Sequence, residues 1–301
     1  MRYAYIGLGN LGGHLAASLA GAGAGFELVV HDRDPAARAR FDALGVAWAD
    51  SPAEAVSGAD AVFTCLPSPK VSEAVLAQIL PAMKPGADWI EMSTLGREDV
   101  LRLAERAQAA GMGVLECPVT GGVHLAAQGK ITVLAGGPAE VVARHRPALD
   151  AMGGQFFHMG ELGSAAIIKV ITNMLAFIHL VADGEALMLA KRGGLDLKTA
   201  WQAIAASSGN SFVHETEGQL ILNGSYDIAF TMDLALKDLG FAMGFGREFG
   251  VPLDLASTAE QTFLKGRAAY GGAAQSTQIV KLLEDVLGTD LRAEGFPARL
   301  E

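Results

Sequence analysis

The pattern of the chain changes near residues 160–163, and this change constrains the fold more than any other feature. Before it, short apolar runs alternate with segments of helical periodicity, and strands are predicted at residues 3–6, 27–31, 61–66, 88–92, 113–117, 131–135 and 155–158. After it, only helical patterns follow, at residues 164–191, 199–206, 212–222, 233–249, 253–269 and 278–287. Strands that alternate with helices favour a parallel, doubly wound sheet. We therefore predict an α/β domain at residues 1–162 and an all-helical domain at residues 163–301, joined by a long helix over about residues 164–191.

Length, charge and cysteine content exclude several classes of protein. The 301 residues suit two domains, and 50% of them are hydrophobic, which argues against disorder. The net charge is -10 and no run rich in Lys or Arg occurs, so no nucleic-acid partner is predicted. Cys65 and Cys117 form neither a disulfide framework nor a zinc spacing, and we predict no metal site. The chain opens with a strand-like run and no signal peptide, so a reducing, cytoplasmic location is expected.

The apolar run from Ser164 to Ala182 is long enough to cross a bilayer. Lys169, Asn173 and His179 interrupt it, and no basic flank marks a cytoplasmic side. A helix that is apolar all round is either a membrane span or a buried core helix. We interpret this run as a buried core helix and expect no membrane partner.

A glycine-rich loop lies between the first predicted strand and a helix. Gly7 allows a tight turn, Gly9 lets the backbone approach a pyrophosphate, and Gly12 lets helix and strand pack closely. Asp32 ends the second strand about 20 residues further on, the position from which an acidic side chain binds the ribose hydroxyls. Arg33 could instead pair with a 2′-phosphate. The pattern favours NAD, with NADP possible, and the predicted cofactor-binding loop is Gly7-Leu8-Gly9-Asn10-Leu11-Gly12.

Two further turns follow the predicted strands at residues 61–66 and 88–92. Leu66 and Pro67 end the first of these strands, and Ser93 and Thr94 end the second. Ligands bind at the carboxyl ends of strands in open α/β sheets, so Leu66, Pro67 and Thr94 are predicted cofactor contacts. Ordinary strand-ending turns are the alternative.

Lys169 and Asn173 are the candidate catalytic residues. They are four residues apart in the apolar helix and share one helix face. Burial disfavours the ammonium form, so a lysine in such a place either is paired or can exchange a proton with a substrate. The alternative is a lysine whose ammonium reaches out to solvent, or one in an ion pair with Glu161, Asp183 or Glu185, and spacing alone leaves these possibilities open.

The stretch Thr120-Gly121-Gly122 follows the predicted strand at residues 113–117. Adjacent glycines expose backbone N–H groups and the threonine adds a hydroxyl, which together would suit a small carboxylate. The alternative is a glycine-rich turn. Among the histidines, we expect His124 to be solvated or to line a pocket, His214 to lie on a surface helix face beside Glu215, and His179 to be a satisfied core residue.

These stretches together resemble a β-hydroxyacid dehydrogenase of the 3-hydroxyisobutyrate dehydrogenase family. The matching segments are Gly7–Gly12, Glu116–Gly122, Gly129–Gly137, Gly163–Asn173 and Lys237–Leu239, whose order and spacing fit over nearly the whole chain. The resemblance implies a Rossmann-type domain and a helical domain joined by a long helix. It also implies a homodimer or homotetramer.

The resemblance also implies roles for single residues. Lys169 is implied as the general acid/base and Asn173 as its support. Thr120-Gly121-Gly122 is implied to bind the substrate carboxylate, and Phe212 to contact the substrate. Lys237 is implied to reach both cofactor and substrate.

The chain departs from the family pattern at several positions. Thr120 stands for the usual serine, Glu116-Cys117 for aspartate-alanine, and Thr172 for the first of two asparagines. Asp32-Arg33 combines the aspartate of NAD enzymes with the arginine of NADP enzymes. The catalytic pair is kept, and these departures leave the exact substrate open.

We predict an enzyme that transfers a hydride between a nicotinamide cofactor and a small β-hydroxy acid or its semialdehyde. A 6-phosphogluconate dehydrogenase would need arginines for a sugar phosphate, which the catalytic helix does not offer. Imine reductases usually lack the lysine found at Lys169. A non-catalytic dinucleotide-binding protein is the alternative from another class, and the Lys169–Asn173 pair argues against it.

Overall fold

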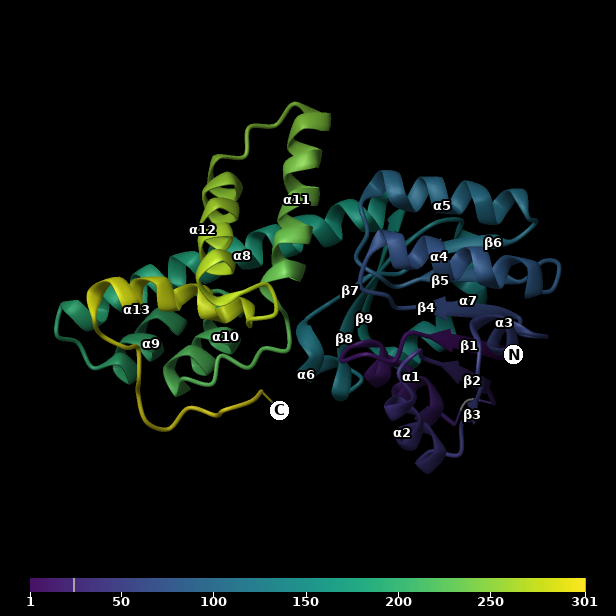
Figure 1. Ribbon diagram of the computed structural model, residues 1–301, viewed down its shortest axis with the longest axis horizontal. Helices are drawn as coiled ribbons and strands as arrows, with labels where there is room; N and C mark the ends of the chain where they lie inside the picture. Colours follow the sequence, from purple (N-terminus) through teal and green to yellow (C-terminus); the bar gives the residue numbers. More distant parts are fainter. Residues whose placement is uncertain (24, 301) are drawn as a thin grey trace. The chain divides into compact units, whose positions relative to one another are not determined.

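The computed structural model describes residues 1–23 and 25–300. They divide into two compact units, Met1–Lys169 and Val170–Glu301. The first holds the strands and the second is helical (Figure 1). The helix α8, Ser164–Arg192, begins in the first unit and continues into the second.

The described residues of the first unit contain a nine-stranded sheet. Its strands are β1 Arg2–Ile6, β2 Glu27–His31, β3 Ala47–Trp48, β4 Ala61–Thr64, β5 Asp88–Glu91, β6 Gly113–Glu116, β7 Val119–Thr120, β8 Ile131–Gly136 and β9 Gly153–Gly160. The order is β3-β2-β1-β4-β5-β6-β8-β7, with β9 paired to β8. The first six strands in this order are parallel to one another. The predicted doubly wound sheet is confirmed, and its parallel arrangement holds for these six strands.

The strand β8 departs from the purely parallel sheet that the alternation suggested. It runs antiparallel to β6 and β7, whereas β9 is parallel to β8. Parallel neighbours need a crossover of about a dozen residues or more. The chain between Thr120 and Ile131 holds only the short helix α6, Gly122–Ala127, so β8 returns in the opposite direction.

Helices cover both faces of the sheet, because its strands are apolar on both sides. Tyr3 and Tyr5 enter one core, and Ala4 and Ile6 the other, as the two-residue period of a strand requires. The first core includes side chains of α1 Gly12–Gly21, α2 Arg38–Ala43 and α7 Ala139–Met152. The second includes those of α3 Pro52–Val56, α4 Pro69–Ile79 and α5 Arg97–Ala109. Short 3₁₀ helices at Pro35–Ala37 and Leu80–Ala82 complete this unit.

The second unit packs its helices around one apolar core. They are the later part of α8, α9 Leu197–Ala205, α10 Phe212–Asn223, α11 Met232–Phe249, α12 Asp254–Tyr270, a 3₁₀ helix at Ser276–Val280 and α13 Lys281–Leu287. Phe177 and Phe263 meet edge-on at 5.4 Å between ring centroids in this core. The helices α11 and α12 lie side by side (Figure 1).

Helix α8 is less buried than predicted. Among the described residues it is the one helix long and apolar enough to cross a membrane by length and composition. Of the most apolar 18-residue stretch of this helix, 33% is buried. Leu180 and Leu187 lie in the core, but Leu175 and Leu189 are exposed. His179 is exposed as well, so its prediction as a core histidine is wrong. A helix presents only one stripe to a core, and the other apolar side chains of α8 lie outside that stripe.

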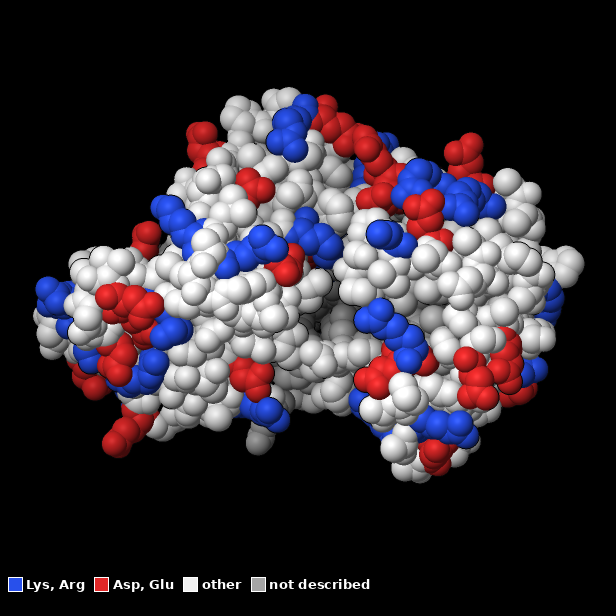
Figure 2. Space-filling model, in the orientation of Figure 1, with Lys and Arg blue, Asp and Glu red and all other residues white. Residues whose placement is uncertain are grey.

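Charges of both signs are interspersed on the molecular face drawn in Figure 2. Several charged side chains form ion pairs near the surface, such as Arg106 with Glu73 at 2.7 Å and Arg102 with Glu73 at 3.0 Å. Exposed pairs of this kind contribute little to stability.

Candidate functional site

The glycine loop has the geometry that its spacing predicts. Gly7 has a positive φ of 98°, and a Cβ there would clash with the carbonyl oxygen of Cys65. A Cβ on Gly12 would clash with the carbonyl oxygen of Gly7. At Gly9, by contrast, a Cβ would meet nothing within 4 Å. Gly7 and Gly12 are therefore required by packing, and the open space at Gly9 lies at the start of α1.

Asp32 connects the end of β2 to this loop. Its carboxylate accepts a hydrogen bond from the backbone N–H of Leu8 at 2.6 Å and another from that of Asp34 at 2.8 Å. Arg33 is exposed beside it. A second arginine, Arg40, which sequence reasoning missed, lies 3.0 Å from the ring of His14 on the first turn of α1. Both signs of charge therefore lie near the nucleotide end.

The turns after β4 and β5 are joined by Ser93. Its hydroxyl accepts from the backbone N–H of Leu66 at 2.7 Å and donates to the carboxylate of Glu91. Burial raises the pKa of Glu91 to about 6, against the lowering effect of its bonds with Ser93. Ser93 thus holds the two strand ends together and brings the segments with Leu66 and Thr94 to the same edge of the sheet.

The predicted carboxylate cradle lies at the end of β7. Thr120 is half-buried and pairs with Thr132 on β8. Gly121 and Gly122 have positive φ values of 125° and 87°, which side chains rarely adopt. The ring of His124 lies against Gly122, and burial lowers its pKa. The cradle therefore needs its glycines, and His124 borders it.

Lys169 is buried, with 8% of its surface exposed, in the second turn of α8. The first turn is held by Glu116, the last residue of β6. Its Oε1 accepts from the N–H groups of Gly163 at 2.6 Å and Ala165 at 2.9 Å, and its Oε2 from that of Ala166 at 3.1 Å. Sequence reasoning noted Glu116 as a departure from the family pattern without assigning it this contact.

In the second unit, Asp238 on α11 gathers two predicted site residues. The Asn173 amide donates to Oδ2 of Asp238 at 2.6 Å, and the Lys237 ammonium donates to its Oδ1 at 2.7 Å. Asp238 is 1% exposed. Phe212, at the start of α10, is exposed. The sequence pointed to Asp238 only as part of the segment Lys237–Leu239, which matches the family pattern.

His214 was predicted to lie on the surface, and this prediction is wrong. It is fully buried, with Nδ1 3.2 Å from Asp183 and Nε2 2.9 Å from the carbonyl oxygen of Trp201. Burial alone would lower its pKa, but the bonds to Asp183 and Trp201 raise it overall. The helix α10 mixes polar and apolar residues around its axis, so its buried face could not be read from periodicity.

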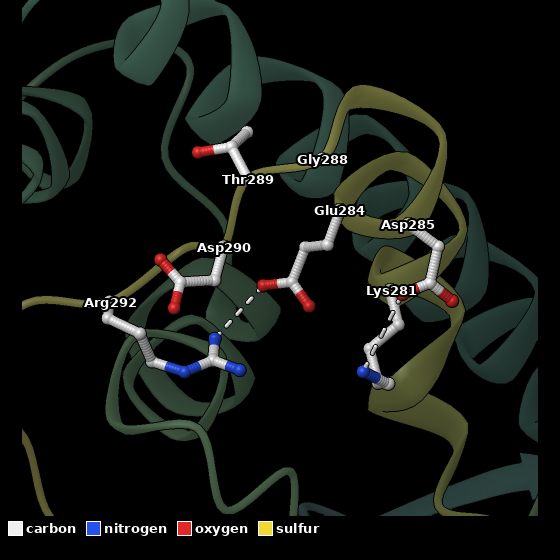
Figure 3. A pocket seen from close by; sticks show the side chains of 7 residues that line it. All are labelled: Lys281, Glu284, Asp285, Gly288, Thr289, Asp290 and Arg292. Carbon is white, nitrogen blue, oxygen red and sulfur yellow. Dashed lines mark hydrogen bonds and ion pairs between the residues drawn. The ribbon is translucent and has the colours of Figure 1, made fainter.

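A surface depression of about 620 Å³ lies elsewhere, around α13, and contains none of the predicted site residues (Figure 3). Glu284 in its wall is bonded to the Tyr226 hydroxyl at 2.6 Å, to Arg292 at 2.9 Å and to the N–H of Leu291 at 2.7 Å. These bonds satisfy its carboxylate, so we assign Glu284 a structural role. Within residues 1–23 and 25–300, no group of three or more His, Cys, Asp or Glu is placed to hold a metal ion.

Comparison with known proteins gives matches over both units. The family described as "NAD binding domain of 6-phosphogluconate dehydrogenase" matches residues 2–160, and that described as "NAD-binding of NADP-dependent 3-hydroxyisobutyrate dehydrogenase" matches residues 163–283. The 2-(hydroxymethyl)glutarate dehydrogenase of Eubacterium barkeri is 30% identical over 295 residues, 97% of each chain. The L-threonate dehydrogenase of Cupriavidus necator is 34% identical over 286 residues, 93% of this chain and 95% of that protein.

A solved structure extends the match to three dimensions. The 3-hydroxyisobutyrate dehydrogenase of Mycobacterium tuberculosis, solved with L-serine, is 31% identical with a TM-score of 0.83, covering 94% of this chain and 98% of that one. The chain belongs to the β-hydroxyacid dehydrogenase family. As a β-hydroxyacid dehydrogenase it is an NAD(P)-dependent oxidoreductase acting on a small hydroxy acid, which confirms the predicted family and reaction class.

The nucleotide end of this β-hydroxyacid dehydrogenase fits a dinucleotide. The space at Gly9 is open, and the first turn of α1 contains no acidic residue that would repel a phosphate. A helix N-terminus without such a residue attracts anions through its unpaired N–H groups. The start of α1 is therefore suited to a phosphate group.

Proposed function

We propose that Lys169 is the proton-transfer residue of this dehydrogenase. When bound, the nicotinamide supplies a hydride acceptor or donor at C4. In the oxidation, the substrate carbon loses a hydride while its hydroxyl proton passes to the neutral amine of Lys169, and the reduction reverses both transfers. The observation that carries the proposal is the burial of Lys169 in a helix whose first turn is held by a buried carboxylate.

The other site residues take supporting roles in this proposal. Asn173 orients the reacting oxygen, and its amide is itself oriented by Asp238. The Thr120 hydroxyl and the N–H groups of Gly121 and Gly122 hold the substrate carboxylate, since two adjacent glycines without side chains leave their backbone N–H groups accessible to a small anion. Lys237 adds positive charge for the cofactor or substrate, and Phe212 provides an apolar contact to the substrate.

We propose NAD as the preferred cofactor. Its support is the Asp32 carboxylate at the end of β2, which can accept from ribose hydroxyls and would repel a 2′-phosphate. Leu66, Pro67 and Thr94, which follow the carboxyl ends of the neighbouring parallel strands β4 and β5, would also contact the cofactor. Arg33 and Arg40 act in the opposite direction, so both cofactors belong in the first assay.

The substrate we propose is a 3-hydroxyisobutyrate-like hydroxy acid. Relatives are named for 2-(hydroxymethyl)glutarate and L-threonate, and the M. tuberculosis structure contains L-serine. A panel of these acids with 3-hydroxyisobutyrate, each assayed with NAD and with NADP, would identify the substrate from nicotinamide absorbance. Turnover on none of them would contradict the proposed substrate class.

The decisive variant is Lys169→Ala. General acid–base groups contribute about 10²- to 10⁴-fold to rate, so turnover should fall by about that factor while cofactor affinity is retained. Lys191→Ala is the matched control, because Lys191 lies on the last turn of the same helix. Near wild-type turnover in Lys169→Ala would show that another group transfers the proton.

We also propose a homodimer or homotetramer. Its support is the exposed apolar surface of α8, which includes Ile171, Leu175 and Leu189. Apolar surface of this kind on a helix marks a site of protein contact.

A further inference from the structure

Glu116 occupies an unusual position for a carboxylate. It ends a central strand, is 1% exposed, and accepts hydrogen bonds from three backbone N–H groups at the start of α8. The first N–H groups of any helix have no partner within the helix and need one from elsewhere. Here the partner comes from 47 to 50 residues earlier in the chain.

The surrounding residues make room for this carboxylate. Gly136 on β8 is paired with Glu116, and a Cβ at Gly136 would clash with the Glu116 carboxylate. Burial raises the pKa of Glu116 to about 7, and the bonds from Ala165, Gly163 and Ala166 oppose that rise. A buried acid costs stability unless its bonds compensate, so its contact with α8 is the feature that accounts for its presence.

Glu116 is linked to both parts of the proposed site in the first unit, to one along the chain and to the other through its side chain. Its backbone is four residues before Thr120, and β7 is held in register by the pairing of Thr120 with Thr132. Its side chain holds Ala165 and Ala166, which precede Lys169 by one helical turn. One residue therefore connects the strand leading into the carboxylate cradle with the helix carrying the lysine.

We infer that Glu116 is a positioning residue that sets the place of Lys169 relative to the cradle at Thr120-Gly121-Gly122. The inference rests on the proposed function. A rigid link is needed because the proton acceptor and the carboxylate anchor must hold one small substrate at the same time. A displacement of about 1 Å in such a site can cost about 10²-fold in rate.

The test is Glu116→Gln, which keeps the shape but replaces one accepting oxygen with an NH₂ group that faces N–H donors. We expect kcat to fall by about 10- to 100-fold and cofactor affinity to stay unchanged. The deuterium kinetic isotope effect on kcat, which reports on hydride transfer, should increase. Glu116→Asp, which keeps the charge on a shorter side chain, should regain part of the activity and serves as the second variant if Glu116→Gln does not fold.

Asp88→Asn is the matched control. Asp88 is also a 1%-exposed carboxylate in this sheet, but it starts β5 and bonds Arg144 and His145. The Asp88→Asn substitution should lower Tm without changing kcat or the isotope effect on kcat. If Glu116→Gln behaves like Asp88→Asn, Glu116 only stabilises the fold and the inference is overturned.

Hydrogen exchange separates this inference from the proposed function. Glu116→Gln should accelerate amide exchange at Gly163, Ala165 and Ala166, whatever the substrate is. Unchanged exchange at these amides overturns the inference even if activity falls. Full activity in Lys169→Ala would instead overturn the proposed function and the catalytic part of this inference, while exchange would still decide whether Glu116 holds the helix.

Discussion

At the scale of single residues, Asp238 decides how Asn173 can act. Its carboxylate receives the Asn173 amide N–H and the Lys237 ammonium at 2.6 Å and 2.7 Å. Because the NH₂ group of Asn173 points at Asp238, its carbonyl oxygen is the atom turned away as an acceptor. The carbonyl oxygen of Asn173 is therefore expected to accept a hydrogen bond from the substrate.

We expect Asp238→Asn to lower kcat/KM by about 10- to 100-fold, since a hydrogen bond to a charged group contributes about 1.5–3 kcal/mol. Steady-state kinetics would measure it, and the double variant with Asn173→Ala should show a strongly non-additive effect. Asp233→Asn on the same helix is the control, because Asp233 pairs with Arg267 at the surface. Additive losses would show that Asp238 and Asn173 act independently.

At the scale of elements, α8 and α10 share a cluster of acidic side chains, of which Asp183 is buried and Glu217 half-buried. Asp183 on α8 bonds His214 on α10, and Glu217 lies one turn after His214. Within the described residues, Asp183 Oδ2 and Glu217 Oε2 are buried without a hydrogen-bond partner. Burial and the charge of Asp183 raise the pKa of Glu217 to about 8.

This cluster predicts a pH dependence of stability. The folded pKa of Glu217 is above its ordinary value of 4.5, so between about pH 4.5 and 8 the folded state binds more protons than the unfolded state. The free energy of unfolding should therefore fall as pH rises through that window, by at most about 1.4 kcal/mol per pH unit from this group. Urea unfolding across the window would measure the slope.

Glu217→Gln should flatten that slope, and Glu215→Gln on the exposed side of α10 should leave it unchanged. Other buried acids, Glu91 and Glu116, act in the same direction at lower pH, so the difference between the two variants is the quantity to compare. Equal slopes in both variants would show that Glu217 ionises normally in the folded protein.

At the scale of the whole molecule, the proposed self-association can be tested on α8. Leu175 is exposed on this helix, so Leu175→Glu should shift a dimer or tetramer towards the monomer in light scattering after size exclusion. Glu185→Gln, at an exposed polar position of the same helix, should not. A monomeric wild-type protein would contradict the proposal directly.

Much of the architecture could be predicted because its signals are local. The two-residue period placed β2 at Glu27–His31 as observed, and the change near residues 160–163 marked the end of the strands. The short pieces β3, α3, β7 and α6 were missed, because two to six residues carry too little periodicity. The division into compact units falls between Lys169 and Val170, inside α8, where the helical pattern itself does not change.

The sequence by itself determined the order of the longer strands and helices, the glycine loop and the family, because each depends on residue types at short or fixed spacings. Only the tertiary structure decided that β8 runs antiparallel, that His214 is buried, that one side of α8 is exposed, and that Glu116 holds the helix of Lys169. These features depend on which distant segments meet. The partner of a buried carboxylate can lie 50 residues away, and no local pattern records that contact.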